Sequence, residues 1–288
     1  MSPIPKFRTV FIGNRPNILR VLETHKNIDL VLCFVSDTDM VKFPNRTVVK
    51  KISTDQKAEV LQSLDDTTFD LLVSAGCPFK IPVNDVPERR VYVNSHPSAL
   101  PKGRGHHPIN ESLISEHQTA GSTLHYISAT FDAGDIIHQE TFQLTEDVDA
   151  QLLYGFIFEF EAEVFTKGLQ KLLDHNLNYC GCPQIGPSTY YTRKQEDRYS
   201  DLKTEPTKIY LAKVRSFSSK KQGAITELIN KKIVVFHAEL VTNSFLIERY
   251  KRSLPGTQLL DYHSEILLIR TVDGLVKIND WSDYDENS

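Results

Sequence analysis

Short apolar runs that alternate with helical periodicity fill the first quarter of the chain, and they constrain the fold more than any other feature. The runs Arg8–Ile12, Asp29–Val35 and Phe69–Ser74 have the length of buried strands. Segments with a helical pattern lie between them, at Pro16–Leu22 and Ala58–Leu64. Strands that alternate with helices form a parallel sheet covered on both faces. The sequence therefore predicts an α/β domain built on a mostly parallel sheet.

The rest of the chain contains a long helix and then a β-rich end. Apolar residues at helical spacing over Leu152–Leu173 predict an amphipathic helix that closes the main domain. From Ile209 onward, short β-rich runs separated by turn signals predict a smaller domain, and we expect the acidic end Asp280–Ser288 to be frayed. The expected parts are a catalytic domain over residues 1–180, a linker over 181–206 and a small β-rich C-terminal domain over 207–288.

Composition and charge argue against several classes of partner. Of the 288 residues, 40% are hydrophobic and 24% are charged, as is ordinary for a globular protein with a packed core. The formal net charge of −4 gives no basic field that would attract nucleic acid. No apolar run approaches the ~20 residues that span a bilayer, residues 1–6 contain no leader-like stretch, and the four cysteines are typical of reduced thiols. We therefore expect a cytoplasmic protein that binds neither membranes nor nucleic acid.

Two polar side chains share one side of a predicted strand end. Val91–Val93 is a short apolar run, and because strand side chains repeat every second residue, Asn94 and His96 leave its end pointing the same way. An imidazole can accept a proton, a carboxylate such as Asp132 can hold that imidazole and favour its charged form, and an amide can donate to a developing oxyanion. These residues fit an acyl transfer. They equally fit a structural role, in which Asn94 and His96 brace the next loop and Asp132 caps a turn with Gly134.

Three other features remain open on the residues alone. Ten histidines raise the question of a metal site, but no ligand set such as H-E-x-x-H is present, so we expect no metal. Ala75–Pro82 follows a strand and has the apolar character to hold a flat heterocycle, or it is a connecting loop. Gly13–Arg15 precedes a predicted helix and fits either a phosphate site or a plain turn.

Three groups of residues together form a pattern that resembles a known family. They are Asn94-x-His96-Pro97-Ser98-x-Leu100-Pro101 with Arg104-Gly105, then Gly121-Ser122-Thr123-Leu124-His125, then Asp132-Ala133-Gly134-Asp135. In this order and spacing they resemble the formyltransferases that use N10-formyltetrahydrofolate, over about residues 8–175. The resemblance implies a Rossmann-like catalytic domain, N10-formyltetrahydrofolate as formyl donor, and Asn94, His96 and Asp132 as the catalytic residues.

The same resemblance implies where the folate binds. Its expected contacts come from the loop after Phe69–Ser74, the loop after His96 and the segment around Asp132. They are Gly76, Cys77, Phe79, Ile81, Leu100, Lys102, Gly103, Arg104, Gly105, Phe131 and Asp135.

The acceptor is implied by residues outside those motifs. Gly13–Arg15, Pro187–Lys194 and the late run from Gly223 to Glu239 with Pro255–Thr257 are similar to the sugar N-formyltransferases. Members of that group act on nucleotide-linked amino sugars, often a dTDP-linked 4-amino-4,6-dideoxyhexose used in bacterial surface polysaccharide. The residues expected to bind this small-molecule substrate are Asn14, Arg15, Ser98, His125, Tyr190, Tyr191 and Arg193.

Two other functions stay open at this point. A methionyl-tRNA formyltransferase would be expected to offer a basic surface to its nucleic acid. A non-catalytic protein that binds folate and nucleotide would keep both pockets without turnover, against which the intact Asn94, His96 and Asp132 argue. We also expect a homodimer, since the small β-rich domain can pair across a dimer.

Overall fold

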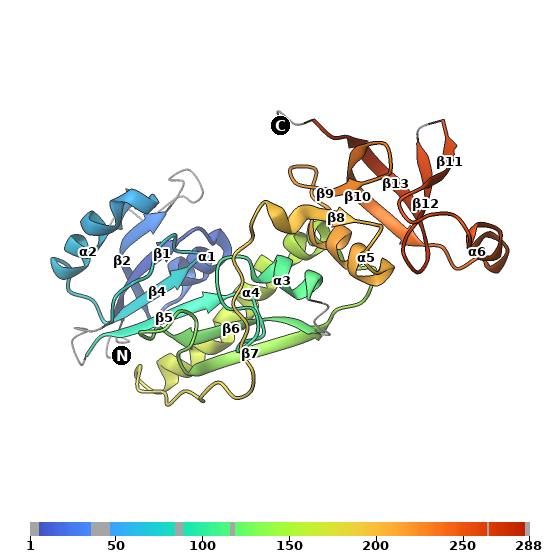
Figure 1. Ribbon diagram of the computed structural model, residues 1–288. Coiled ribbons are helices and arrows are strands. Elements are labelled where there is room, and N and C mark those ends of the chain that lie inside the picture. Colours follow the sequence, from blue (N-terminus) through green and yellow to red (C-terminus); the bar gives the residue numbers. More distant parts are fainter. Residues whose placement is uncertain (1–5, 36–46, 84–88, 116–118, 264, 286–288) are drawn as a thin grey trace. The chain divides into compact units, whose positions relative to one another are not determined.

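A computed structural model describes residues 6–35, 47–83, 89–115, 119–263 and 265–285 of the chain (Figure 1). The chain divides into two compact units, which are described separately. The first comprises residues 1–105, 120–142 and 156–190, and the second comprises residues 106–119, 143–155 and 191–288. The predicted boundaries around residues 181–206 stay a prediction, and segments 1–5 and 286–288 lie outside the described residues. Across the described ranges, no helix has the length and apolar character that crossing a bilayer requires.

The first unit contains a seven-stranded sheet that is mostly parallel. Its strands are β1 (Phe7–Gly13), β2 (Ile28–Val35), β3 (Val48–Lys51), β4 (Leu71–Ala75), β5 (Val91–His96), β6 (Thr119–Tyr126) and β7 (Ile136–Gln143). They lie in the order β3-β2-β1-β4-β5-β6-β7. The first five run parallel, and β6 runs antiparallel to β5. The predicted α/β fold with a mostly parallel sheet is confirmed.

Helices cover both faces of this sheet, and β1 shows how the sequence sets the faces. Phe11 packs in a buried cluster with residues of α1 (Pro16–Thr24) and the C-terminal part of α4 (Ala150–Asp174). Its neighbours Val10 and Ile12 pack in a second cluster with α2 (Lys57–Asp65), which follows the short turn η1 (Thr54–Gln56). Because side chains alternate along a strand, the two clusters lie on opposite faces. Burial on both faces explains why these strands are continuously apolar.

The chain changes direction across the sheet between β1 and β4. From β1 it proceeds to β2 and β3 on one side, and then returns to β4 on the other side of β1. The backbone N–H of Asn14, just after β1, donates to the carbonyl oxygen of Ala75 at the end of β4, at 2.9 Å. Parallel α/β sheets bind ligands beyond the carboxyl ends of strands at such a point. Asn14 and Arg15 follow β1 at this edge, and Gly76–Ile81 follows β4.

Among the described residues, the second unit contains a six-stranded sheet, the first residues of α4 and three further helices. Its strands are β8 (Tyr199–Asp201), β9 (Ala224–Glu227), β10 (Lys232–Leu240), β11 (Gln258–Tyr262), β12 (Ile266–Arg270) and β13 (Leu275–Asp283), in the order β11-β12-β13-β10-β9-β8. The helices are α3 (Pro108–Ile114), α5 (Thr207–Ser216) and α6 (Ser244–Tyr250), with a short turn at η2 (Glu196–Arg198). The β-rich character predicted for this end of the chain is confirmed.

Two predictions for this unit were wrong. The β-rich part predicted from Ile209 onward begins later, because Ile209 lies in α5, which buries Tyr210, Leu211 and Val214 at helical spacing. The acidic end does not fray from Asp280, because β13 continues to Asp283 and pairs there with β10. In both cases pairing or packing with distant residues outweighs the local pattern.

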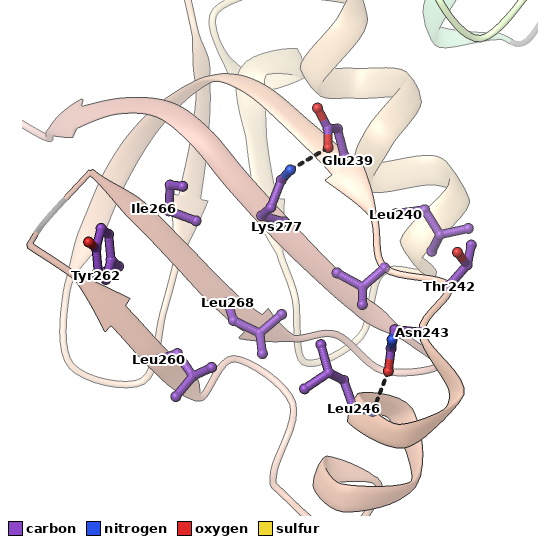
Figure 2. A pocket seen from close by; sticks show the side chains of 11 residues that line it. Glu239, Leu240, Thr242, Asn243, Leu246, Leu260, Tyr262, Ile266, Leu268 and Lys277 are labelled. Atoms are coloured by element: carbon purple, nitrogen blue, oxygen red, sulfur yellow. Dashed lines mark hydrogen bonds and ion pairs between the residues drawn. The ribbon is translucent and has the colours of Figure 1, made fainter.

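The second sheet carries an open apolar groove of about 400 Å³. Figure 2 shows its lining: Leu260 and Tyr262 from β11, Ile266 and Leu268 from β12, and Leu246 from α6. Lys277 and Glu239 form an ion pair at one side of it, with Nζ and Oε2 2.7 Å apart. The Oδ1 of Asn243 accepts from the N–H of Leu246 at 3.1 Å and so caps α6.

Candidate active site

Strand β5 places Asn94 and His96 on one face of the first sheet. Val93 packs in the cluster that includes α1 and α4. The side chains on either side of it in sequence therefore point to the opposite face, and His96 repeats the direction of Asn94. The strand extends beyond the predicted Val91–Val93, so both residues lie within β5 and their backbone is held by the hydrogen bonds of the sheet.

Asp132 reaches both residues from the connection between β6 and β7. Its φ of 50° lies in the left-handed region, which turns its side chain back toward β5. Asn94 Nδ2 donates to Asp132 Oδ1 at 3.3 Å, and His96 Nε2 lies 3.9 Å from Asp132 Oδ2. The three residues predicted to be catalytic are thus brought together from two separate segments.

The orientation of His96 is set by the following loop rather than by Asp132. His96 Nε2 donates to the carbonyl oxygen of Gly103 at 2.7 Å, whereas 3.9 Å to the carboxylate is longer than a hydrogen bond. Asp132 Oδ2 instead accepts from the N–H of Gly105 at 2.9 Å. The carboxylate therefore acts on His96 through its charge, and the orienting role that we predicted for it belongs to Gly103.

His125 is a fourth member of the cluster. It lies directly opposite Asn94 on β6, and its Nε2 is 3.2 Å from Asn94 Nδ2. Its Nδ1 donates to the carbonyl oxygen of Tyr126 at 2.8 Å. Burial lowers the pKa of His125 to about 4, although the nearby Asp132 carboxylate acts to raise it. A buried neutral ring that uses both nitrogens within the protein does not fit the substrate contact predicted for it.

A distant segment holds the loop that follows His96. Thr189 Oγ1 accepts from the N–H of Gly103 at 2.8 Å, and the carbonyl oxygen of Thr189 accepts from the N–H of Arg104 at 3.2 Å. Gly103 and Gly105 have φ values of 74° and 100°, which glycine adopts without strain. The loop is therefore shaped by its own glycines and by contacts that the sequence did not suggest.

Gln184 connects this loop to the Asp132 segment, and sequence reasoning missed it. Its Nε2 donates to the carbonyl oxygens of Asp132 and Gly134 at 2.8 and 2.9 Å, and its Oε1 accepts from Arg104 Nη2 at 2.7 Å. A Cβ on Gly134 would meet the carbonyl oxygen of Tyr126 at 1.8 Å, so this turn requires glycine. Gln184 lies in an irregular stretch without periodicity, and no local signal marks it.

Ser98 and Leu100 of the loop are buried and bonded to neighbouring strands, whereas Lys102 is exposed. Thr123 Oγ1 donates to the carbonyl oxygen of Ser98 at 2.7 Å, and Gln139 Nε2 donates to the carbonyl oxygen of Leu100 at 2.8 Å. The N–H of Lys102 donates to the carbonyl oxygen of Ala99 at 3.2 Å. Among the described residues, Ser98 Oγ and Arg104 Nε are buried side-chain atoms that meet no hydrogen-bond partner. Ser98 and Arg104, both predicted to contact ligands, thus each have a polar atom without a hydrogen-bond partner among the described residues.

The predicted folate loop after β4 is apolar and uncharged at its centre. Ile81 belongs to the buried cluster that includes residues of α2, and Cys77 and Phe79 pack against that cluster. Gly76, at the start of the loop, has a φ of 72°. Cys77 Sγ donates to the carbonyl oxygen of Phe79 at 3.2 Å, and burial raises the pKa of this thiol to about 11, so it is neutral.

This loop meets the segment that leads to Asp132. Lys80 Nζ donates to the carbonyl oxygen of Ala129, and a cavity of about 260 Å³ lies beside the two residues. Lys57, Pro82 and Val83 complete its lining. Since Gly105 also bonds to Asp132, the three segments predicted to border the folate are brought into contact.

Arg15 and Asn14, predicted to bind the substrate, are engaged within the protein. Arg15 Nε donates to Oε2 of the buried Glu161 at 3.0 Å, and its guanidinium lies 4.0 Å from the centroid of the Phe158 ring. Arg15 Nη1 also donates to Asn14 Oδ1. These contacts fix the guanidinium at the carboxyl end of β1, at the edge where parallel sheets bind ligands.

The other predicted residues have varied surroundings. In the first unit, the carbonyl oxygen of Asp135 accepts from the N–H of Tyr126 at 2.9 Å, Phe131 is half-buried, and Tyr190 is exposed. Tyr191 and Arg193 belong to the second unit. There Tyr191 donates to Asp197 Oδ2 at 2.6 Å, and the N–H of Arg193 donates to His107 Nδ1 at 3.2 Å.

Comparison with known proteins places this geometry in context. Residues 23–169 match a family model described as formyl transferase. The bifunctional polymyxin resistance protein ArnA of Wigglesworthia glossinidia brevipalpis is 31% identical over 166 residues, which cover 58% of this chain and 24% of that protein. The methionyl-tRNA formyltransferase of Coprothermobacter proteolyticus is 30% identical over 173 residues, which cover 60% of this chain and 56% of that enzyme. The chain therefore matches less than two thirds of the length of these curated relatives.

One solved structure aligns with this chain over almost all its length. It is an N-formyltransferase from Helicobacter canadensis in complex with folinic acid and dTDP-3-aminofucose. The TM-score is 0.66 at 18% sequence identity, and the alignment covers 96% of this chain and 100% of that one. At this identity, the similarity shows a shared fold.

Proposed function

Because the chain belongs to the formyl transferase family, we propose that it transfers the formyl group of N10-formyltetrahydrofolate to the amine of a nucleotide-linked amino sugar. One observation carries the chemical part of this proposal. Asn94 and His96 both lie against Asp132, at 3.3 and 3.9 Å, at the ligand-binding edge of the sheet. An amide donor, an imidazole and a carboxylate are the groups that acyl transfer to an amine requires.

In this proposal Asn94 stabilises the charge that develops on the formyl oxygen. When the acceptor amine adds to the formyl carbon, the oxygen gains negative charge, and an N–H of Asn94 Nδ2 donates to it. His96 accepts the proton that the amine loses, through Nδ1, since Nε2 carries the hydrogen that is donated to Gly103. The Asp132 carboxylate, 3.9 Å away, favours the protonated ring that results.

The folate-bordering segments fit the proposed donor in two respects. The apolar residues Cys77, Phe79 and Ile81 of the loop suit a flat heterocycle, and the buried Arg104 Nε, unpartnered among the described residues, gives a polar donor for it. N10-formyltetrahydrofolate supplies the formyl carbon, while the chain's own residues position it and exclude water.

A dTDP-linked 4-amino-4,6-dideoxyglucose or a close relative is the acceptor we propose, with a role in bacterial surface polysaccharide such as O-antigen. The full-length alignment with an N-formyltransferase solved with dTDP-3-aminofucose supports a sugar acceptor. Matches to methionyl-tRNA formyltransferases reach 78% of this chain at 25% identity, so tRNA is the competing acceptor, but the net charge of −4 does not favour a polyanion. The homodimer and the cytoplasmic location stay predictions.

The test is an acceptor panel. The purified chain is mixed with N10-formyltetrahydrofolate and, in parallel, with dTDP- and UDP-linked 3-amino and 4-amino sugars or with charged initiator tRNA. Mass spectrometry of the acceptor and absorbance of the released tetrahydrofolate report transfer. We expect formylation of a nucleotide amino sugar, retained in the presence of a chelator and absent with His96→Ala.

Each other outcome is informative. Formylation of the tRNA alone would replace the sugar by the tRNA as acceptor. Loss of activity on chelation would require a metal. Binding of both ligands without product, in a chain that is folded by circular dichroism, would show a binding protein and contradict the proposal.

A further inference from the structure

The amide of Asn94 has both of its hydrogens directed at protein groups. Nδ2 lies 3.2 Å from His125 Nε2 and 3.3 Å from Asp132 Oδ1. An amide nitrogen has two hydrogens, so these two contacts use its whole donor capacity. Both distances are at the long end for N–H donors, so neither bond is strong. A formyl oxygen can therefore replace Asp132 as the acceptor of one hydrogen while the other stays on His125.

The tautomer of His125 decides which end of this amide faces it. Since Nδ1 donates to the carbonyl oxygen of Tyr126 at 2.8 Å, a neutral ring has a lone pair at Nε2. Reversing the amide would place Asn94 Oδ1 against that lone pair and against the Asp132 carboxylate. Asn94 Oδ1 would then face two other hydrogen-bond acceptors with no hydrogen between them, which is strongly unfavourable in a buried site.

The pairing is enforced by the fold. Asn94 and His125 are direct partners in the antiparallel register of β5 and β6, so their side chains lie on the same face. The His125 side chain is only 2% exposed, which excludes water as a competing partner for Nε2.

From these contacts we propose that His125 is a positioning residue: its Nε2 fixes the Asn94 amide so that Nδ2, not Oδ1, faces the formyl oxygen. This inference rests on the proposed function for its catalytic meaning. The orientation itself does not depend on which acceptor the enzyme uses.

A matched pair of substitutions separates positioning from simple structural support. In His125→Gln the side-chain amide reaches the place of the imidazole Nε2 and keeps an acceptor for Asn94. In His125→Asn it reaches only the place of Nδ1, so the bond to Tyr126 can form but Asn94 loses its acceptor. His125→Gln thus loses the hydrogen bond to Tyr126, and His125→Asn loses the one to Asn94. We expect His125→Asn to lower kcat by about 10- to 100-fold with KM for the formyl donor nearly unchanged, and His125→Gln to keep most of the turnover.

A double mutant tests whether His125 acts through Asn94. If it does, His125→Asn will have little further effect on kcat when Asn94 is already alanine. If the fold-losses in kcat of the two single substitutions multiply in the double mutant, the proposal is contradicted. So would equal losses in His125→Gln and His125→Asn, since both variants would then report only on packing.

A spectroscopic measurement keeps this inference separate from the proposed function. In protein labelled with ¹⁵N-histidine, the ring nitrogens of His125 should show a protonated Nδ1 and an unprotonated Nε2 at neutral pH, assigned by their loss in His125→Gln. A protonated Nε2 would overturn the positioning role even in an active enzyme. The expected tautomer in a wild-type chain that formylates none of the acceptors would leave the positioning intact and sink the proposed function.

Discussion

The candidate active site and the groove on the second sheet organise their side chains in opposite ways. In the site, Asn94, His125 and Asp132 are polar, mostly shielded from water and bonded to one another. In the groove, Leu260 and Tyr262 are apolar and exposed (Figure 2). Polar groups interact strongly where water is excluded, and apolar groups gain nothing until something covers them. The size of a pocket therefore does not by itself identify the candidate active site of this chain.

Two contacts of carboxylates show the same contrast in numbers. Glu239 and Lys277 beside the groove are 2.7 Å apart, but their side chains are 48% and 41% exposed. His125 Nε2 and Asp132 Oδ1 are 3.7 Å apart, with exposures of only 2% and 6%. Water screens the first pair, and an exposed pair of this kind contributes about 0–1 kcal/mol. In the longer contact, burial lowers the pKa of His125 to about 4 against the opposing charge of Asp132, so the ring is neutral.

The largest effect that we predict separates the two regions by turnover. Asn94→Ala removes the donor to the formyl oxygen and should lower kcat by about 10²- to 10³-fold, measured as formyl transfer at saturating donor. Leu260→Ala removes a similar number of atoms from the groove and should leave kcat unchanged. A large loss of turnover in Leu260→Ala, with the protein folded, would break the comparison.

An intermediate effect is expected for Gln184, which supports the site without touching the reacting atoms. Gln184→Ala leaves Arg104 and two backbone carbonyls without their partner, at a cost of about 1–3 kcal/mol in the free energy of unfolding. Because the Asp132 segment then loosens, kcat should also fall about 10-fold.

Asn243→Ala is the matched control for Gln184. It removes the cap of α6 in the groove and should cost about 1 kcal/mol in stability with kcat unchanged. Urea unfolding and transfer kinetics on both variants decide the matter. If the two variants lose stability and both keep full turnover, Gln184 is merely structural.

The sequence predicted the parts of this architecture that depend on local pattern. Continuous apolar runs such as Asp29–Val35 identify strands buried on both faces, and the spacing of Asn94 and His96 places them on one face of β5. Asp132 could be joined to them only through a resemblance, because the length of chain between β5 and the β6–β7 connection carries no spatial information.

What the sequence did not predict depends on register and on long-range contacts. His125 faces Asn94 because β6 runs antiparallel to β5 in one particular register, and a shift by one residue would turn it to the other face. Gln184 and Thr189 act from an irregular segment, where no periodicity indicates a partner. The β-rich part was expected from Ile209 onward, but packing in the second unit, not local propensity, selects the helix α5 there.

The smallest effect sharpens the contrast between the two carboxylate contacts through acid stability. Burial, together with His96 and Arg104, lowers the pKa of His125 from 6.5 to about 4, against the opposing charge of Asp132. The unfolded chain therefore binds a proton at His125 near pH 6.5, whereas the folded chain binds it only near pH 4. Because the unfolded state binds more protons between these values, the free energy of unfolding falls as the pH is lowered through this window. His125→Gln cannot titrate, and its unfolding free energy should fall less between about pH 7.5 and 5 in urea titrations. Glu239→Gln should follow the wild-type slope there, because the pKa of Glu239 is lowered by Lys277 and its small contribution is lost only in stronger acid. A wild-type slope in His125→Gln would mean that His125 binds a proton as readily in the folded protein as in the unfolded chain, so that burial would not keep the ring neutral in weak acid.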